Sequence, residues 1–238
     1  MATVSVESLA QAVSDALGPR LVSLILYGSA ARGSGAHVSG RSDINTLLIC
    51  DAVDDDLFVR LGAPVRGWTR AGNPAPLILT EREWRESADV FAIEYEEMRE
   101  AHRVLAGRDP WSGVRVVRAD VRRQLEQELM GKLVRLRQAY LALHGDRKAL
   151  SRAIVASTAS FFTMLRATLR LAGTAPPQGA EALVREAARV IGWPAEPLSA
   201  LVAHASARAT LTLRAGDPLP GAYLAAVART AEFVNTLA

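Results

Sequence analysis

The first fifty residues alternate between amphipathic and continuously apolar segments. Apolar residues recur at helical spacing over 4–17, and a Gly-Pro pair ends this pattern. Two apolar runs, 20–27 and 44–50, are rich in leucine and β-branched side chains, which is typical of buried strands. A glycine-rich loop over 28–40 joins these two runs. We therefore expect one helix followed by two neighbouring strands.

Shorter elements follow. The pattern predicts a short helix over 54–61, and the glycines and prolines between 62 and 76 oppose any longer element there. A short apolar run at 77–79 predicts a third strand. Thr80 and Glu83 come directly after it in the spacing of a capping box, which indicates that a helix begins at this point.

The segment 90–96 alternates between apolar and acidic positions. Phe91, Ile93 and Tyr95 share one parity, and Glu94 and Glu96 share the other. Because successive side chains of a strand point to opposite faces, this pattern predicts a strand with an acidic face. That face could serve a binding site, or it could simply face water at the edge of a sheet.

From residue 119 onward the strand signals stop and helical periodicity takes over. A boundary near 107–113 therefore divides the chain into predicted domains 1–112 and 113–238. The expected fold class is α+β, with an N-terminal mixed-sheet domain followed by a C-terminal α-helical bundle. The predicted helices of the bundle cover 121–143, 150–172, 180–191, 197–207 and 221–237.

Composition narrows the class of protein. The chain has 238 residues, 50% hydrophobic and 22% charged, which favours a globular protein over a disordered one. Its formal charge of +3 permits an anionic partner without requiring nucleic acid, which we consider an unlikely partner. There is neither a signal-peptide pattern nor a long apolar run, so we expect a cytoplasmic protein without a membrane span. Cys50 is the only cysteine, which excludes an internal disulfide, and we interpret it as an inert core thiol.

The loop between the first two predicted strands carries the residues with the clearest chemistry. Gly28 and Ser29 leave the first strand, and Asp43 and Asn45 enter the second. Small residues let a phosphate approach the backbone, where amide groups and a hydroxyl can donate hydrogen bonds to it. Carboxylates at positions i and i+2 of one strand share a face and suit Mg²⁺, which prefers oxygen ligands. Glu94 or Glu96 could supply a third carboxylate.

A family resemblance is carried by the segments Gly28-Ser29, Arg32-Gly33 and Ser42-Asp43-Ile44-Asn45. Together they resemble the signature of the DNA polymerase β-like nucleotidyltransferase superfamily, especially its small bacterial members that adenylylate aminoglycosides. Members of that group pair an α/β nucleotidyltransferase domain with a helical bundle, which is the order of elements expected here. The resemblance implies a nucleoside triphosphate and a small acceptor as partners and Mg²⁺ as the cofactor.

The resemblance also implies roles for single residues. Gly28, Ser29 and Arg32 would bind the nucleotide, and Asp43 would be a catalytic metal ligand. Glu94 would be the third acid of the metal site. The family pattern ends in Asp-x-Asp, whereas this chain has Asn45 at the last position, where a neutral amide would contact metal and nucleotide. Two interpretations follow: a nucleotidyltransferase that transfers a nucleoside monophosphate to a hydroxyl group, or a relative that binds a nucleotide or partner without catalysis.

Two residues of the predicted bundle are further candidates. Lys132 is one of only two lysines among 28 basic residues, and a compact ammonium beside Gly131 suits a triphosphate. Glu128 precedes it by one helical turn and could act as a general base toward the acceptor. Each residue also has an alternative without a catalytic role: Lys132 could simply face solvent, and Glu128 could be its ion-pair partner at the surface. His102 fits a packing or surface histidine better than a catalytic base.

Overall fold

The computed structural model describes residues 5–31, 44–206 and 210–237, and the chain divides into two compact units. The first, Met1–Val116, contains all the described strands, and we call it the sheet unit. The second, Val117–Ala238, is the helical unit. The expected fold class, a mixed sheet followed by an α-helical bundle, is therefore confirmed.

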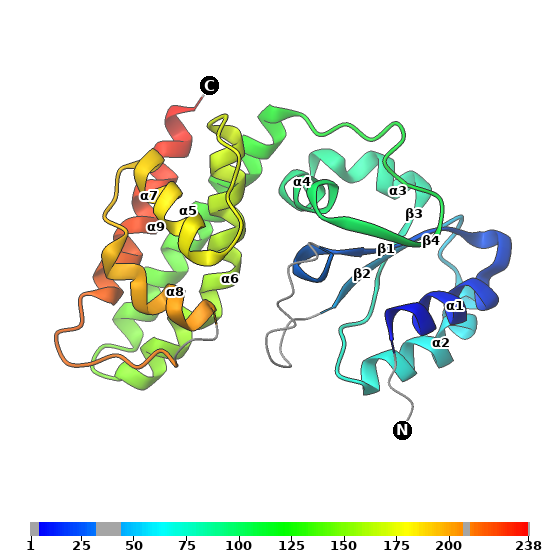
Figure 1. The fold of residues 1–238 in the computed structure, drawn as a ribbon, viewed down its shortest axis with the longest axis horizontal. Helices are drawn as coiled ribbons and strands as arrows, with labels where there is room; N and C mark the ends of the chain where they lie inside the picture. The colour runs from blue at the N-terminus through cyan, green and yellow to red at the C-terminus, as the bar shows by residue number, and fades with distance from the viewer. Residues whose placement is uncertain (1–4, 32–43, 207–209, 238) are drawn as a thin grey trace. The chain divides into compact units, whose positions relative to one another are not determined.

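The sheet unit is built on four strands in the order β3-β2-β1-β4 (Figure 1). The central strand β1 runs antiparallel to both β2 and β4, whereas β3 runs parallel to β2. The sheet is therefore mixed, and the chain enters it through a central strand. The strands are β1 (Leu21–Tyr27), β2 (Asn45–Cys50), β3 (Leu77–Thr80) and β4 (His102–Gly107).

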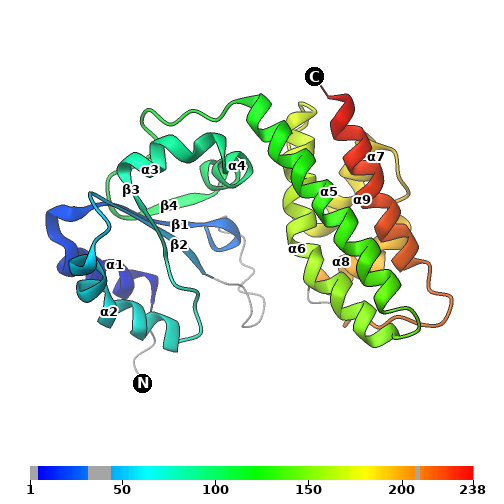
Figure 2. The same ribbon diagram turned by 180° about the vertical axis from the view of Figure 1, so that it is seen from behind.

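Helices cover both faces of this sheet (Figure 2). On one face, Leu24 and Leu48 pack with the buried residues of α1 (Val6–Leu17) and α2 (Asp55–Arg70). On the other face, Ile25 and Leu47 pack with residues of α3 (Glu81–Glu86) and α4 (Ala92–Glu100). The apolar runs of β1 and β2 are continuous rather than alternating because both faces of these strands are buried.

Helix α2 is longer than the sequence predicts. It begins near the expected position, with the Asp54 side chain accepting a hydrogen bond from the backbone N–H of Leu57, but it continues through Pro64 to Arg70. Leu57, Leu61 and Trp68 are buried along one face of the helix. This burial outweighs the one backbone hydrogen bond that a proline inside a helix removes. The expectation that glycine and proline end the helix at 61 is wrong.

The predicted strand over 90–96 is also wrong, because this segment forms helix α4. Its buried residues Ala92, Tyr95 and Met98 recur every three positions, which is a helical spacing. The alternation that favours a strand covers only seven residues, and over so short a segment the same apolar side chains fit a helix as well. The edge strand β4 follows α4 and was not predicted. By contrast, the capping box of Thr80 and Glu83 is present at the N-terminus of α3.

The helical unit contains five α-helices within its described residues. Helix α5 packs along α6 and α9, and α7 and α8 pack against α6 (Figure 1). Phe161 and Tyr223 meet edge to face in its core, with ring centroids 5.4 Å apart. No helix of the described chain is both long and apolar enough to cross a membrane. The helices are α5 (Arg118–Ala142), α6 (Arg147–Leu171), α7 (Ala180–Ile191), α8 (Ser199–Ala205) and α9 (Leu219–Thr236).

Candidate functional site

The turn after β1 brings two of the predicted site residues together. Tyr27 pairs with Asn45 across β1 and β2, and the chain then turns at Gly28 with φ +79°. A side chain at Gly28 would meet the Asn45 amide nitrogen at 3.6 Å, so the amide lies directly beside the turn. The backbone N–H of Gly28 donates to the carbonyl of Ala101 at 3.1 Å, which ties the turn to the start of β4. Glycine fits because other residues rarely adopt this φ.

The same strand ends place Tyr27, Asn45 and His102 on one face of the sheet. Tyr27 lies opposite Asn45 on one side and opposite His102 on the other. Directly opposed residues of antiparallel strands point to the same face. The candidate site therefore occupies one end of the face that α3 and α4 cover. We call Gly28, Tyr27, Asn45 and His102 the strand-end cluster.

Glu94 belongs to the surroundings of this cluster, although it is on a helix. It is an exposed residue of α4, not a strand residue as predicted. Burial raises the pKa of the Tyr27 hydroxyl, and the negative charge of Glu94 raises it further. The carboxylate is therefore close enough to act electrostatically on the strand end.

The strand next to β2 offers no replacement for the missing carboxylate. Leu47 of β2 is paired with Leu77 of the parallel strand β3. The residues that lead into β3 beside Asn45 are Asn73-Pro74-Ala75-Pro76, none of which is acidic. Within the described residues, no three His, Cys, Asp or Glu side chains are placed to hold a metal ion. These residues do not by themselves form a divalent-cation site.

Asp43, Arg32 and Ser29 lie in or beside the loop that follows β1. Asp43 and Arg32 lie outside the described residues. The backbone of Ser29 lies in the short 3₁₀ turn η2 (Gly28–Ala30), directly after β1. The predicted roles of these residues stay predictions.

His102 and Trp111 also lie near the Gly28 turn, which the sequence does not predict. The indole N–H of Trp111 donates to His102 Nε2 at 3.1 Å, so Nδ1 carries the proton and donates to the carbonyl of Met98 at 3.0 Å. Arg99 stacks over the Trp111 ring at 5.1 Å. These contacts fix the first residue of β4 beside the Gly28 turn. The sequence predicts a packing or surface histidine at 102, and its place beside the Gly28 turn depends on the unpredicted strand β4.

Lys132 and Glu128 lie in the helical unit. The Lys132 side chain is 5% exposed, and its ammonium donates to the Ser157 carbonyl at 3.0 Å and to Ser160 Oγ at 2.8 Å. The alternative of a solvent-facing lysine is therefore wrong. Glu128 is half-buried and forms no ion pair with Lys132 within the described chain. The Lys132 ammonium already has hydrogen-bond partners on α6, so it joins α5 to α6 within the helical unit.

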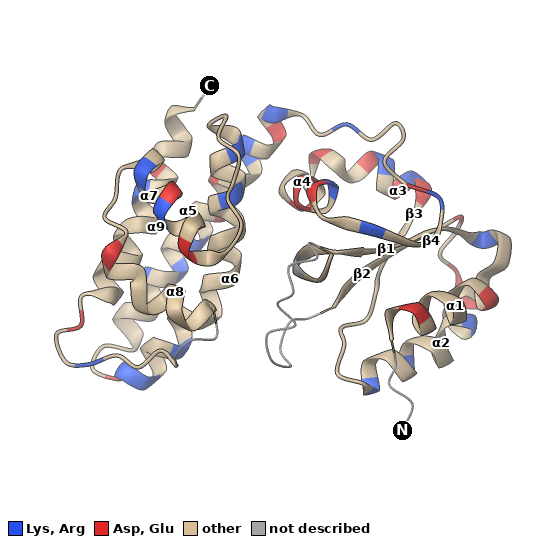
Figure 3. Cartoon of the chain, in the orientation of Figure 1, with Lys and Arg blue, Asp and Glu red and all other residues tan. Residues whose placement is uncertain are grey.

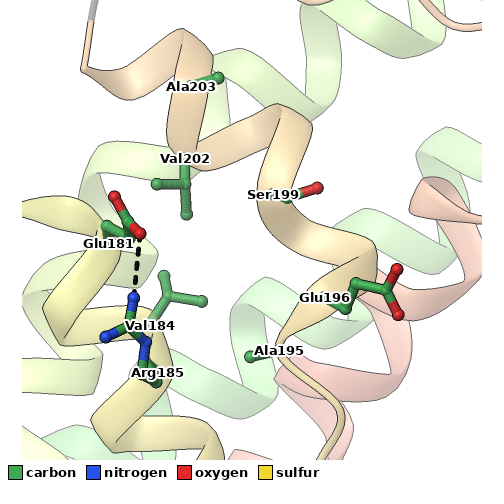
Figure 4. A pocket seen from close by; sticks show the side chains of 8 residues that line it. All are labelled: Glu181, Val184, Arg185, Ala195, Glu196, Ser199, Val202 and Ala203. Carbon is green, nitrogen blue, oxygen red and sulfur yellow. Dashed lines mark hydrogen bonds and ion pairs between the residues drawn. The ribbon is translucent and has the colours of Figure 1, made fainter.

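A pocket of about 430 Å³ lies elsewhere in the helical unit, between α7 and α8 (Figure 4). Arg185 on its wall is paired with Glu181 at 2.9 Å, so the charges of these two side chains offset each other. Val184 and Val202 form its apolar floor. None of the residues predicted from the sequence lines this pocket.

Charged residues are spread over both units rather than concentrated in one element. Lys and Arg lie among Asp and Glu on helices such as α3 and α7, whereas α6 carries five basic residues and no acidic one (Figure 3). Several basic residues are already paired; Arg20, for example, contacts Asp51, Asp54 and Asp56 at 2.9–3.1 Å. The net charge of the chain is +3, and the basic residues of α6 are not offset by acidic residues of the same helix.

Comparison with known proteins agrees with this architecture. The mixed sheet and the helices that follow it form a fold that is also found in a solved structure. A solved structure with a similar fold is spectinomycin adenyltransferase AAD(9) from Enterococcus faecialis with ATP and spectinomycin. The TM-score is 0.57 at 12% sequence identity, over 96% of this chain and 97% of that chain. At this identity the likeness concerns the fold alone. No family model and no curated protein matches the sequence.

Proposed function

We propose that this chain is a nucleotidyltransferase that binds a nucleoside triphosphate at the Gly28 turn and transfers its nucleoside monophosphate to a hydroxyl group of a small acceptor. The observation that carries the proposal is the position of the Asn45 amide beside the Gly28 turn, at adjoining strand ends. The fold shared with an adenyltransferase supports it.

The described residues suit the nucleotide-binding part of this function. With no side chain at Gly28, a phosphate can approach the backbone of the turn closely, and the neighbouring Asn45 amide can donate a hydrogen bond to it. Ser29 and Arg32 would add donors from the same loop. In the transfer step the acceptor oxygen would form a bond to the α-phosphorus, and the bond to the leaving pyrophosphate would break.

Magnesium belongs to this proposal through Asn45 of the strand-end cluster and two carboxylates outside it. Asp43 would hold it, with Asn45 as a neutral oxygen ligand and Glu94 as the nearest candidate for further negative charge. When bound, Mg²⁺ would neutralise part of the triphosphate charge. Glu128 stays a predicted general base, whereas we leave Lys132 out because its ammonium is already hydrogen-bonded.

The first experiment is calorimetric titration of the full chain with ATP, with and without Mg²⁺. We expect Gly28→Ala to weaken ATP binding about tenfold or more, because it places a methyl group against Asn45 and strains the turn. Gly72→Ala is the matched control: Gly72 also has a positive φ, +91°, but has nothing within 4 Å of the added methyl group. Equal binding by both variants, or no binding by the wild type, would contradict the nucleotide site.

The second experiment separates transfer from binding alone. Pyrophosphate release is measured with ATP and a panel of hydroxyl-bearing acceptors, beginning with spectinomycin because the structural neighbour was solved with it. We expect Asp43→Ala to abolish release and Asn45→Asp to increase it, since Asp restores a second carboxylate. ATP binding without release by any variant would favour the non-catalytic alternative.

A further inference from the structure

Lys132 is a buried cation in the seam between α5 and α6. The chain has only two lysines among 28 basic residues, and this one is 5% exposed. Both of its hydrogen-bond partners, the Ser157 carbonyl and Ser160 Oγ, are neutral oxygens. Within the described residues its ammonium forms no ion pair. A buried ammonium without a paired carboxylate is costly in its charged form.

The surroundings favour the neutral amine. Burial lowers the pKa of Lys132 to about 8, the positive charge of Arg135 contributes to the shift, and Glu128 opposes it. Arg135 folds back over Gly131, where its Nη1 would lie 3.3 Å from an added Cβ. The groups that α6 brings to the ammonium, the Ser157 carbonyl and Ser160 Oγ, are uncharged, and Tyr223 of α9 contacts Ser157 Oγ at 2.8 Å. An arginine could not lose its proton here.

Ser160 is the accessible member of this group. It lies on the exposed side of α6, and its Oγ is 2.8 Å from Lys132 Nζ. The Ser157 carbonyl accepts hydrogen bonds from both Lys132 and Ser160, at 3.0 and 3.1 Å, and so fixes the two groups relative to each other. A hydroxyl within hydrogen-bond reach of an amine that can become neutral is the arrangement of a nucleophile and its general base.

We propose that Ser160 is a nucleophilic site that accepts a phosphoryl group from an activated phosphoryl donor, with Lys132 as its general base. The Ser160 hydroxyl turns from the Ser157 carbonyl toward the neutral amine of Lys132, which takes its proton. Ser160 Oγ forms the bond to phosphorus, and the bond from phosphorus to the leaving group breaks. The modified residue is a phosphate ester of Ser160. This activity is separate from the proposed nucleotide site and does not depend on it.

The test uses a fluorophosphonate probe on the full chain, with fluoride as the leaving group. Intact-protein and peptide mass spectrometry should find one adduct, on Ser160. Its rate of formation should rise tenfold or more between pH 6.5 and 9, with a midpoint near the pKa of Lys132, about 8. Ser160→Ala should abolish the adduct. Ser199→Ala is the matched control, because Ser199 is an exposed helical serine for which no lysine contact is found within the described residues.

Lys132→Met tests the base directly. If the variant folds, as judged by circular dichroism, labelling of Ser160 at pH 8 should fall at least tenfold. If it does not fold, the pH profile of the wild type decides the question. Absence of an adduct on Ser160 in the folded wild type overturns the proposal. A labelling rate that does not change with pH, or that is equal in folded Lys132→Met, also overturns it.

Discussion

Polar groups lie at strand ends in the sheet unit and between packed helices in the helical unit. The Gly28 turn and Asn45 meet where β1 ends and β2 begins, so their positions depend on backbone conformation. Lys132 and Ser157 meet inside a helical seam, so their positions depend on side-chain hydrogen bonds that offset the cost of burial. The sheet unit should therefore be sensitive to backbone geometry and the helical unit to charge.

The largest effect should come from Gly107→Ala in the sheet unit. Gly107 ends β4 with φ +77°, and an added Cβ would lie 2.3 Å from the Val22 carbonyl oxygen. Backbone atoms cannot move aside, so the substitution should destabilise the protein by about 3 kcal/mol or more. Urea denaturation followed by circular dichroism measures the loss.

Gly72→Ala separates the two causes of this loss. Gly72 has φ +91° but open space around it, so its substitution introduces backbone strain without a clash. It should destabilise the protein by only about 1 kcal/mol. Equal losses from the two substitutions would mean that the close approach of Gly107 to Val22 does not matter.

How much of the fold follows from the sequence also differs between the units. The bundle follows from long helical periodicity, since burial along one face of a helix repeats over many turns. In the sheet unit, the alternation over 90–96 predicts a strand where helix α4 lies, because seven residues are too few to separate the two periods. Helix α2 was predicted too short because the pattern does not show that Trp68 is buried beyond Pro64.

The candidate site shows the same limit. The position of Asn45 beside the Gly28 turn could be expected, because Gly28 follows the end of β1 and Asn45 begins the neighbouring strand β2. The positions of His102 and Trp111 could not, because they depend on the unpredicted strand β4. The burial of Lys132 depends on which face of α5 packs against α6. The sequence around it, with Gly131 and several arginines, does not show which face that is.

A second prediction concerns charge in the helical unit. The pKa of Lys132 is about 8 in the folded protein and near 10.4 in an unfolded chain. Between these values the unfolded state binds more protons, so the free energy of unfolding should rise with pH, by about 3 kcal/mol at most. Above pH 10 it should fall again, because burial raises the pKa of Tyr223 to about 12 and unfolding then releases its proton.

Lys132→Met is the variant that isolates this effect. Methionine keeps the apolar volume and removes the charge, so the rise between pH 8 and 10 should disappear while the fall above pH 10 remains. Urea midpoints measured at pH 7.5, 8.5 and 9.5 for both proteins make the comparison. A rise of equal size in the variant would assign it to another group.

Gly131→Ala should change the stability of the protein least. It alters the backbone of α5 beside Lys132, so it should also change the pH dependence of stability. Alanine is favoured over glycine inside a helix by up to about 1 kcal/mol. The added Cβ would lie 3.3 Å from Arg135 Nη1, which is the far end of a flexible side chain and can move away. We therefore expect a gain in stability below 1 kcal/mol. Since Arg135 helps to lower the pKa of Lys132, its displacement should also shift the stability rise to higher pH. Urea midpoints over the same pH series measure both changes, and a loss of stability would mean that Arg135 cannot move.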